Sequence, residues 1–265
     1  MPLSYRHSRV HEKFSTGASN MAHMNITVSE QLDSLSLRAT GFPVVAYFDL
    51  DRTLIDGYSL TALAFQQIFE GDMSLKRFVN LASVFLSYGL GRKCYNEILQ
   101  ATVDDITGMA ESDLYALGRR AFDHRLADWT YREGLDLIEA HKQRGHYVVL
   151  VTSATKYQAL PIAEVLGIDH MRCTEIEIVA GKVAGGVNPC YGEGKVSAAI
   201  DFAHSVGATL ADAYFYTDSQ DDLPLLEKVG HPIVVNGKSK LAKISQDRGW
   251  PRIEFQQKER LSRAA

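Results

Sequence analysis

Three short apolar runs of the sequence each stop abruptly at polar residues. β-branched and aromatic residues dominate all three runs, which predicts buried strands. Long stretches of helical character separate them, so we expect an open α/β sheet with its ligand site at the carboxyl ends of the strands. The runs are residues 44–48, 147–151 and 213–217.

The span between the first two runs, residues 57–145, has helical rather than strand character. Nothing in it alternates with a period of two, and we interpret it as an inserted helical cap with Ser59 as an N-cap. Residues 78–90 are strongly apolar but shorter than the roughly 20 residues of a bilayer span. A buried cap helix is the favoured interpretation, and an interfacial helix touching lipid is the alternative. Helices are expected over residues 59–65, 78–90, 95–102, 111–125 and 131–144.

The pattern divides the chain into four parts. Residues 1–40 hold few large apolar side chains and no apolar stretch of a secretory signal, which predicts a flexible leader rather than a targeting segment. Residues 41–56 and 146–255 form the predicted α/β core, residues 57–145 the cap, and residues 256–265 a tail. Within the core, residues 156–166 are expected to be helical, and alternation over residues 175–187 predicts a β-hairpin.

Composition limits the classes of partner. The 265 residues are 46% hydrophobic, enough for a large core, and the net charge of -4 argues against a nucleic-acid partner. The cysteines Cys94, Cys173 and Cys190 are scattered, odd in number and without C-x-x-C spacing. They are interpreted as reduced thiols, so a cytoplasmic location without stable membrane insertion is expected.

Carboxylates follow two of the three predicted strands. Asp49 and Asp51 come directly after the first, where the spacing of two residues puts both side chains on one face. Asp218 and Asp222 follow the third. Four carboxylates at one sheet edge repel each other unless a cation lies between them, and Mg²⁺ prefers such oxygen ligands. Ser153, after the second strand and before a helix, is a weak phosphate-site signal on its own.

Four segments resemble, in order and spacing, the motifs of the haloacid dehalogenase superfamily: D-L-D-R-T (49–53), V-T-S-A (151–154), G-K-V (194–196) and D-S-Q-D-D-L-P (218–224). The helical insertion resembles the cap of the phosphoserine-phosphatase-like branch, subfamily IB. The resemblance covers about residues 44–255. It implies a Rossmann-like parallel sheet core with an inserted all-helical cap.

The resemblance also implies a Mg²⁺-dependent phosphomonoester hydrolase that works through an aspartyl-phosphate. Asp49 is then the nucleophile and Asp51 the general acid and base. The phosphate-binding residues implied are Thr53, Ser153, Ala154 and Lys195. The metal would be held by Asp49, the backbone carbonyl of Asp51, and Asp218, with Asp222 acting through water or by orienting Lys195.

Departures from the family pattern bear on the substrate. Tyr58 stands where phosphoserine phosphatases carry a glutamate that meets the substrate ammonium, and Ala154 and Asp221 replace their usual glycine and asparagine. Phosphoserine is therefore disfavoured, and a small organic phosphate is expected, with a lysophosphatidate-like ester as one option. A phosphotransferase and an idle phospholigand-binding protein are the alternative functions. The sequence leaves the oligomeric state open.

Overall fold

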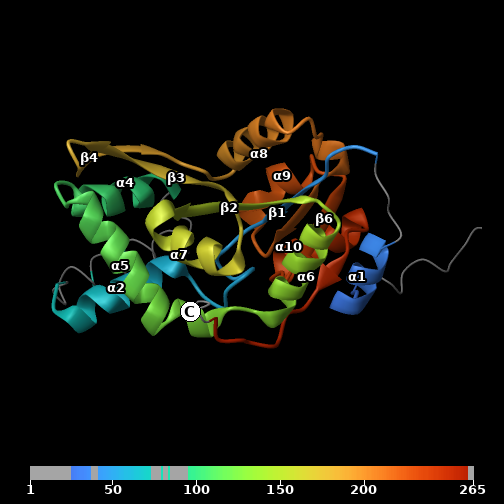
Figure 1. The fold of residues 1–265 in the computed structure, drawn as a ribbon, viewed down its shortest axis with the longest axis horizontal. Coiled ribbons are helices and arrows are strands. Elements are labelled where there is room, and N and C mark those ends of the chain that lie inside the picture. Colours follow the sequence, from blue (N-terminus) through green and yellow to red (C-terminus); the bar gives the residue numbers. More distant parts are fainter. Residues whose placement is uncertain (1–24, 37–40, 73–78, 80–82, 84–94, 262–265) are drawn as a thin grey trace, which may run out of the picture.

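The computed structural model of the chain describes residues 25–36, 41–72, 79, 83 and 95–261. Within them, one sheet has the strand order β4-β3-β2-β1-β5-β6-β7, and helices cover both of its faces (Figure 1). Every pairing is parallel except that of β3 with β4. This confirms the predicted Rossmann-like α/β fold. The strands are β1 (Val45–Phe48), β2 (Tyr147–Thr155), β3 (His170–Val179), β4 (Lys182–Asn188), β5 (Tyr214–Thr217), β6 (His231–Val235) and β7 (Arg252–Ile253).

Strand β1 lies in the middle of the sheet, and its side chains alternate between two apolar layers. Ala46 and Phe48 belong to the layer on one face, and Val45 and Tyr47 to the layer on the other. All four are fully buried, as expected for a parallel strand covered on both faces. The first layer includes residues of α1 (Val28–Ser36), α6 (Arg132–Gln143) and α7 (Lys156–Leu166); the second includes residues of α8 (Glu193–Ser205), α9 (Leu223–Leu226) and α10 (Ser239–Arg248).

Three helices, which we call the cap helices, gather at one end of the molecule beside the β3–β4 hairpin (Figure 1). They are α2 (Ser59–Glu70), α4 (Tyr95–Ile106) and α5 (Glu111–His124). Helix α5 packs against α7 and α2, and α4 packs against β4. The next helix, α6, packs against β2 and against α1 of the sheet layer. The predicted boundary between cap and core at residue 145 stays a prediction. Short 3-10 helices lie at Leu126–Trp129, Leu210–Asp212 and Gln220–Asp222.

The apolar segment 78–90 lies outside the described residues apart from Val79 and Ser83, both of which are helical. None of the described helices is long and apolar enough to cross a membrane. The hairpin predicted over 175–187 is present as β3 and β4. Ala180 and Gly181 form its turn with φ of 49° and 74°, values that the chain needs there to reverse direction tightly.

Part of the segment predicted to be a flexible leader, residues 1–40, is helical in the structure: this part is helix α1. Val28, Leu32 and Leu35 lie on one face of α1 and pack into the layer that contains α6. The side-chain amide of Gln31 donates a hydrogen bond to the hydroxyl of Tyr216, at 3.0 Å inside the core. The i, i+4, i+7 spacing of the three apolar residues is the helix signal, although it is too short to stand out in a polar segment.

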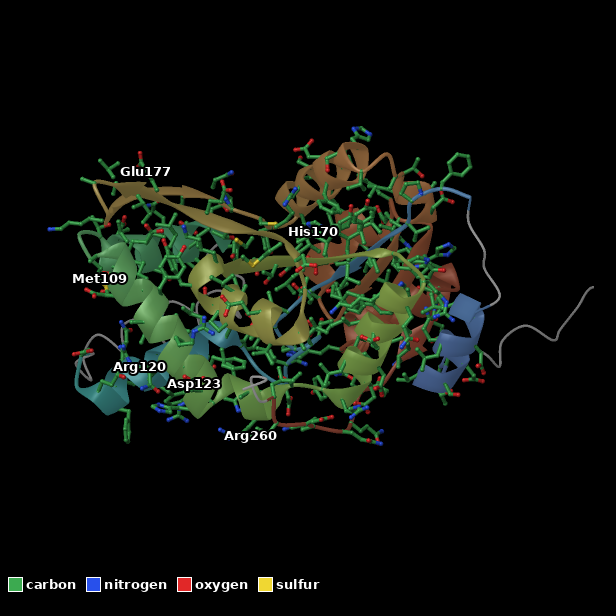
Figure 2. The ribbon with its side chains drawn as sticks, viewed as in Figure 1. Met109, Arg120, Asp123, His170, Glu177 and Arg260 are labelled. Atoms are coloured by element: carbon green, nitrogen blue, oxygen red, sulfur yellow. The ribbon has the colours of Figure 1, made fainter. Side chains whose placement is uncertain are left out.

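Residues 255–261, which we call the strap, continue from β7. They cover the two segments through which the chain passes between the sheet and the cap helices, one at Asp56 and one at residues 127–132; we call these segments the crossings. The strap runs antiparallel to residues 127–132 through hydrogen bonds of 2.8 to 2.9 Å, and Leu261 is buried. Lys258 pairs with Asp56 on the other crossing. Arg260 pairs with Asp128 and donates to the carbonyl of Asp123, and Figure 2 shows Arg260 and Asp123 side by side.

Candidate active site

The acids of the first and fourth motifs lie on neighbouring strands. Strands β1 and β5 pair in parallel, and Asp49 and Asp218 follow directly at their carboxyl ends. The Asp49 N–H donates to the carbonyl of Tyr216 at 3.0 Å, and the Asp218 N–H donates to Thr53 Oγ1 at 3.0 Å. The first and fourth motifs are therefore joined by hydrogen bonds as well as by sheet pairing.

Lys195, in the first turn of α8, lies between two of these acids. Its Nζ is 2.7 Å from Asp49 Oδ1 and 2.8 Å from Asp222 Oδ1. Burial lowers the pKa of Lys195, but Asp222 and Asp49 reverse this effect and raise it above its ordinary value. Burial raises the pKa of Asp49, and Lys195 opposes that rise. The lysine thus stays charged and supplies the cation that a buried carboxylate requires.

Asp51 connects the sheet edge to the first cap helix. Its Oδ1 accepts the N–H of Ser59 at 2.8 Å. The predicted N-cap role of Ser59 is therefore wrong: Ser59 is the first helical residue, Tyr58 is the N-cap without a side-chain bond, and Asp51 accepts the free N–H. Burial raises the pKa of Asp51 to about 6, against the opposing bond from Ser59. A carboxyl group with a pKa near 6 is suited to both donating and accepting a proton near neutral pH.

Arg52 is a charged contact of the site that the sequence analysis missed. Its Nε lies 2.8 Å from Asp218 Oδ2, and its guanidinium lies over the ring of Tyr58, 5.9 Å from the centroid. Arg52 adopts a left-handed backbone with φ of 64° in the tight turn after Asp51. Burial raises the pKa of Asp218 to about 6, and Arg52 opposes this. The signal available in the sequence was a single basic residue directly after the second acid of the first motif.

The second-motif residues lie in an irregular part of β2. The register between β2 and β3 shifts between Thr152 and Thr155, which takes Ser153 and Ala154 out of the regular ladder. Within the described residues, the hydroxyl of Ser153 makes no hydrogen bond and is available to a ligand. The Ala154 N–H donates to Thr152 Oγ1 at 3.1 Å, so it is engaged within the loop.

The remaining predicted phosphate ligand, Thr53, has a different partner from the one expected. Its side chain is fully buried, and its hydroxyl accepts the N–H of Asp218. Thr53 thus fixes the position of the fourth motif, and its phosphate contact stays a prediction. Asp222 is likewise held in place, since its Oδ2 accepts the hydroxyl of Thr217 at 2.6 Å.

The carboxylates fit a magnesium ion by their chemistry. Lys195 contacts one oxygen of Asp49 and Arg52 one oxygen of Asp218, and the second oxygen of each makes no hydrogen bond within the described residues. In the part of the chain that the structure describes, no three His, Cys, Asp or Glu side chains are close enough to form a metal site by themselves. Mg²⁺ needs only one or two carboxylates and otherwise retains water, so these two acids and a backbone carbonyl suffice.

Comparison with known proteins agrees with this geometry. The sequence model of the haloacid dehalogenase-like hydrolases matches residues 46–227, a range that contains every acid named above and Lys195. The chain belongs to the haloacid dehalogenase-like hydrolase family. The resemblance inferred from the four motifs is therefore confirmed.

Individual relatives and solved structures give the extent of the similarity. "Probable phosphatase Rv3661" of Mycobacterium tuberculosis is 35% identical over 216 residues, which are 79% of this chain and 75% of that protein. A solved structure of a protein of unknown function from Bordetella pertussis matches with a TM-score of 0.74 and 26% identity, over 80% of this chain and 98% of its own. A phospho-aspartyl intermediate analogue of phosphoserine phosphatase matches with a TM-score of 0.60 and 18% identity, over 82% and 95%.

Proposed function

We propose that this hydrolase is a Mg²⁺-dependent phosphomonoesterase that cleaves a small organic phosphate through an aspartyl-phosphate. The observation that carries the proposal is the buried contact between Asp49 and Lys195, beside a second acid, Asp51, whose pKa is about 6. A carboxylate held next to a fixed cation can attack phosphorus, and a nearby acid of this pKa can serve the leaving group. The relative that is named a probable phosphatase supports the same reaction class.

The first half of the reaction transfers the phosphoryl group to the protein. Lys195 and the hydroxyl of Ser153 bind the non-bridging oxygens of the substrate phosphate. A carboxylate oxygen of Asp49 forms a bond to phosphorus while the bond from phosphorus to the ester oxygen breaks. Protonated Asp51 gives its proton to that oxygen, so the product leaves as a neutral alcohol.

The second half regenerates the protein. Asp51, now ionised, takes a proton from a water molecule whose oxygen attacks phosphorus, and the bond between Asp49 and phosphorus breaks. Inorganic phosphate leaves, and Asp51 is again protonated. Asp49, the Asp51 carbonyl and Asp218 would hold Mg²⁺, which when bound neutralises negative charge on the phosphate and the surrounding acids.

Substrate choice and location belong to the same proposal. Tyr58 is half exposed next to Arg52 and offers no carboxylate to a substrate ammonium, so phosphoserine stays disfavoured. A small phosphomonoester handled in the cytoplasm is the proposed substrate. A phosphotransferase and an idle binding protein are the competing functions, and both are distinguished by the products formed.

The test measures p-nitrophenol and inorganic phosphate released from p-nitrophenyl phosphate, with Mg²⁺ and with EDTA. We expect wild-type protein to form the two products in equal amounts only with Mg²⁺, Asp49→Asn to lose activity, and Asp247→Asn, on the exposed surface of α10, to retain it. A phosphotransferase would release less phosphate than p-nitrophenol when an alcohol acceptor is added. Activity that persists in Asp49→Asn would refute the proposal.

A further inference from the structure

Tyr95, the first residue of α4, links a cap helix to both loops of the proposed phosphate site. Its hydroxyl donates a hydrogen bond to the main-chain carbonyl of Ser153 at 3.0 Å. Its ring stacks on that of Tyr191, with centroids 3.9 Å apart and planes inclined by 9°. Tyr191 lies four residues before Lys195, in the loop that leads into α8. One cap side chain therefore contacts the loop of Ser153 and the loop of the lysine.

The carbonyl of Ser153 is an acceptor shared by distant parts of the chain. Thr174 of β3 donates its hydroxyl to the same oxygen at 2.7 Å, and that hydroxyl accepts the N–H of Cys190 at 3.1 Å. Burial raises the pKa of Tyr95, so its hydroxyl stays protonated and remains a donor. The conformation of Ser153 thus depends on a cap helix, an adjacent strand and the loop before Lys195 at once.

Ser153 requires this support because its backbone lies outside the regular ladder of the sheet. The register shift beside it separates it from the even hydrogen bonds that hold the rest of β2 to β3. An irregular segment of a strand keeps a single conformation only where its surroundings fix it. Among the described residues, Tyr95 and Thr174 are the two side-chain donors to the Ser153 carbonyl, so losing the bond from Tyr95 removes one of them.

We infer that Tyr95 is a positioning residue that couples docking of the cap helices to phosphate binding at Ser153. The inference rests on the proposed function, since it assumes that Ser153 binds the phosphate. When α4 is docked, the bond from Tyr95 holds the Ser153 loop in its binding conformation. By linkage, phosphate bound at Ser153 then stabilises the docked position of α4 to the same extent.

The test removes only the hydroxyl, with Tyr95→Phe, and compares it with Tyr115→Phe, which removes a hydroxyl from the exposed side of α5. The quantities measured are kcat and KM for p-nitrophenyl phosphate, the inhibition constant of inorganic phosphate, and hydrogen exchange of residues 95–106 with and without phosphate. For Tyr95→Phe we expect KM and the inhibition constant to rise about threefold to tenfold, the effect of losing one hydrogen bond, with kcat changed less than about twofold. Tyr115→Phe should match wild type.

Hydrogen exchange gives a reading that does not depend on turnover. Phosphate should slow exchange in residues 95–106 of wild-type protein, and this slowing should shrink in Tyr95→Phe. Tyr191→Leu removes the ring on which Tyr95 stacks, and it should raise KM and the inhibition constant of inorganic phosphate as Tyr95→Phe does. An unchanged inhibition constant together with unchanged protection by phosphate in Tyr95→Phe would overturn the coupling.

The two proposals fail in different ways. If phosphate binds to wild-type protein and slows hydrogen exchange in α4, but no product is released from the ester, hydrolysis is refuted and the coupling is supported. Wild-type protein that hydrolyses the ester, with Tyr95→Phe equal to it in every constant, refutes the coupling alone. Wild-type protein that neither hydrolyses the ester nor binds phosphate refutes both.

Discussion

Both carboxylate oxygens of Asp222 contact the ammonium of Lys195: Nζ lies 2.8 Å from Oδ1 and 2.9 Å from Oδ2, and neither side chain is more than 3% exposed. Asp49 contacts the same ammonium from the neighbouring strand end. Two carboxylates from separate segments therefore share one buried cation. Such a group holds the site together, but it makes each member depend on the others, because an unpaired charge in the interior is costly.

Replacing Lys195 by methionine should lower the free energy of unfolding by about 3–5 kcal/mol, since two buried carboxylates lose their partner. Activity toward p-nitrophenyl phosphate should be lost as well. Urea denaturation followed by circular dichroism measures the first effect. The double variant Lys195→Met/Asp222→Asn should be more stable than the sum of the two single variants predicts, and strict additivity would contradict the shared-charge account.

Replacing Arg52 by glutamine should strengthen Mg²⁺ binding about threefold to tenfold, or by about 1 kcal/mol, because Asp218 loses the cation that neutralises it. Isothermal titration with MgCl₂ measures the dissociation constant directly, without turnover. Arg132→Gln, which removes an exposed arginine from α6, is the matched control and should leave the constant unchanged. Weaker or equal Mg²⁺ affinity in Arg52→Gln would show that Arg52 does not compete for Asp218.

A buried histidine should make stability depend on pH. His141 lies in the core with Nε2 2.9 Å from the hydroxyl of Tyr216 and Nδ1 2.8 Å from His146 Nδ1. Burial lowers the pKa of His141 well below 6.5, and the nearby positive charges of His146, Arg144 and His231 lower it further. His141 therefore stays neutral in the folded protein at pH values below about 6.5, where the same residue of the unfolded chain is protonated.

The sign follows from this difference in protons bound. The contribution of His141 to the free energy of unfolding is zero above about pH 6.5, where both states are neutral at this residue, and below it falls by about 1.4 kcal/mol for each pH unit until the folded-state pKa is reached. Asp51 and Asp218, whose pKa values are raised to about 6, contribute with the opposite sign, so the effect of His141 is the difference between wild type and a variant without it. Denaturant curves from pH 7.5 to 5 measure the slope. His141→Gln should reduce the slope, and His204→Gln, on the exposed surface of α8, should leave it unchanged.

The strap should contribute to stability mainly through its buried side chains, Phe255 and Leu261. Leu261→Ala should lower the free energy of unfolding by about 2 kcal/mol because it empties a site in the apolar layer. Arg260→Ala removes an ion pair whose partners are 61% and 47% exposed, so the loss should stay below about 1 kcal/mol. Thermal and urea unfolding of the two variants compare the effects. A larger loss for Arg260→Ala would mean that surface charge, not burial, fixes the strap.

The sequence predicted those parts of the molecule that depend on a local pattern. Strands β1, β2 and β5 are apolar runs bounded by polar residues, so their positions and the acids at their ends could be inferred directly. Strands β6 and β7 were not predicted, since β6 contains a proline and β7 has only two residues. Their place in the sheet depends on pairing with β5, which is a property of the whole fold.

The same distinction separates the site residues. Asp49, Asp218 and Lys195 could be named because each belongs to a recognisable motif, whereas the roles of Arg52 and Tyr95 depend on partners 166 and 58 positions away in the chain. No local pattern marks a tyrosine that will meet a particular carbonyl. Thr53 shows the converse: its motif position suggested a ligand contact, while its buried hydroxyl binds the backbone of Asp218.

The strap also affects the order in which the protein matures during synthesis. Every segment that residues 255–261 contact lies earlier in the chain, so the crossings at Asp56 and Asp128 can be fastened only after the strands have emerged from the ribosome. The packing of α5 against α7 and of α4 against β4 does not involve the strap, so these contacts can form before residues 255–261 are synthesised. We therefore expect the segments at Asp56 and Asp128 to be fastened after the cap helices have docked on α7 and β4.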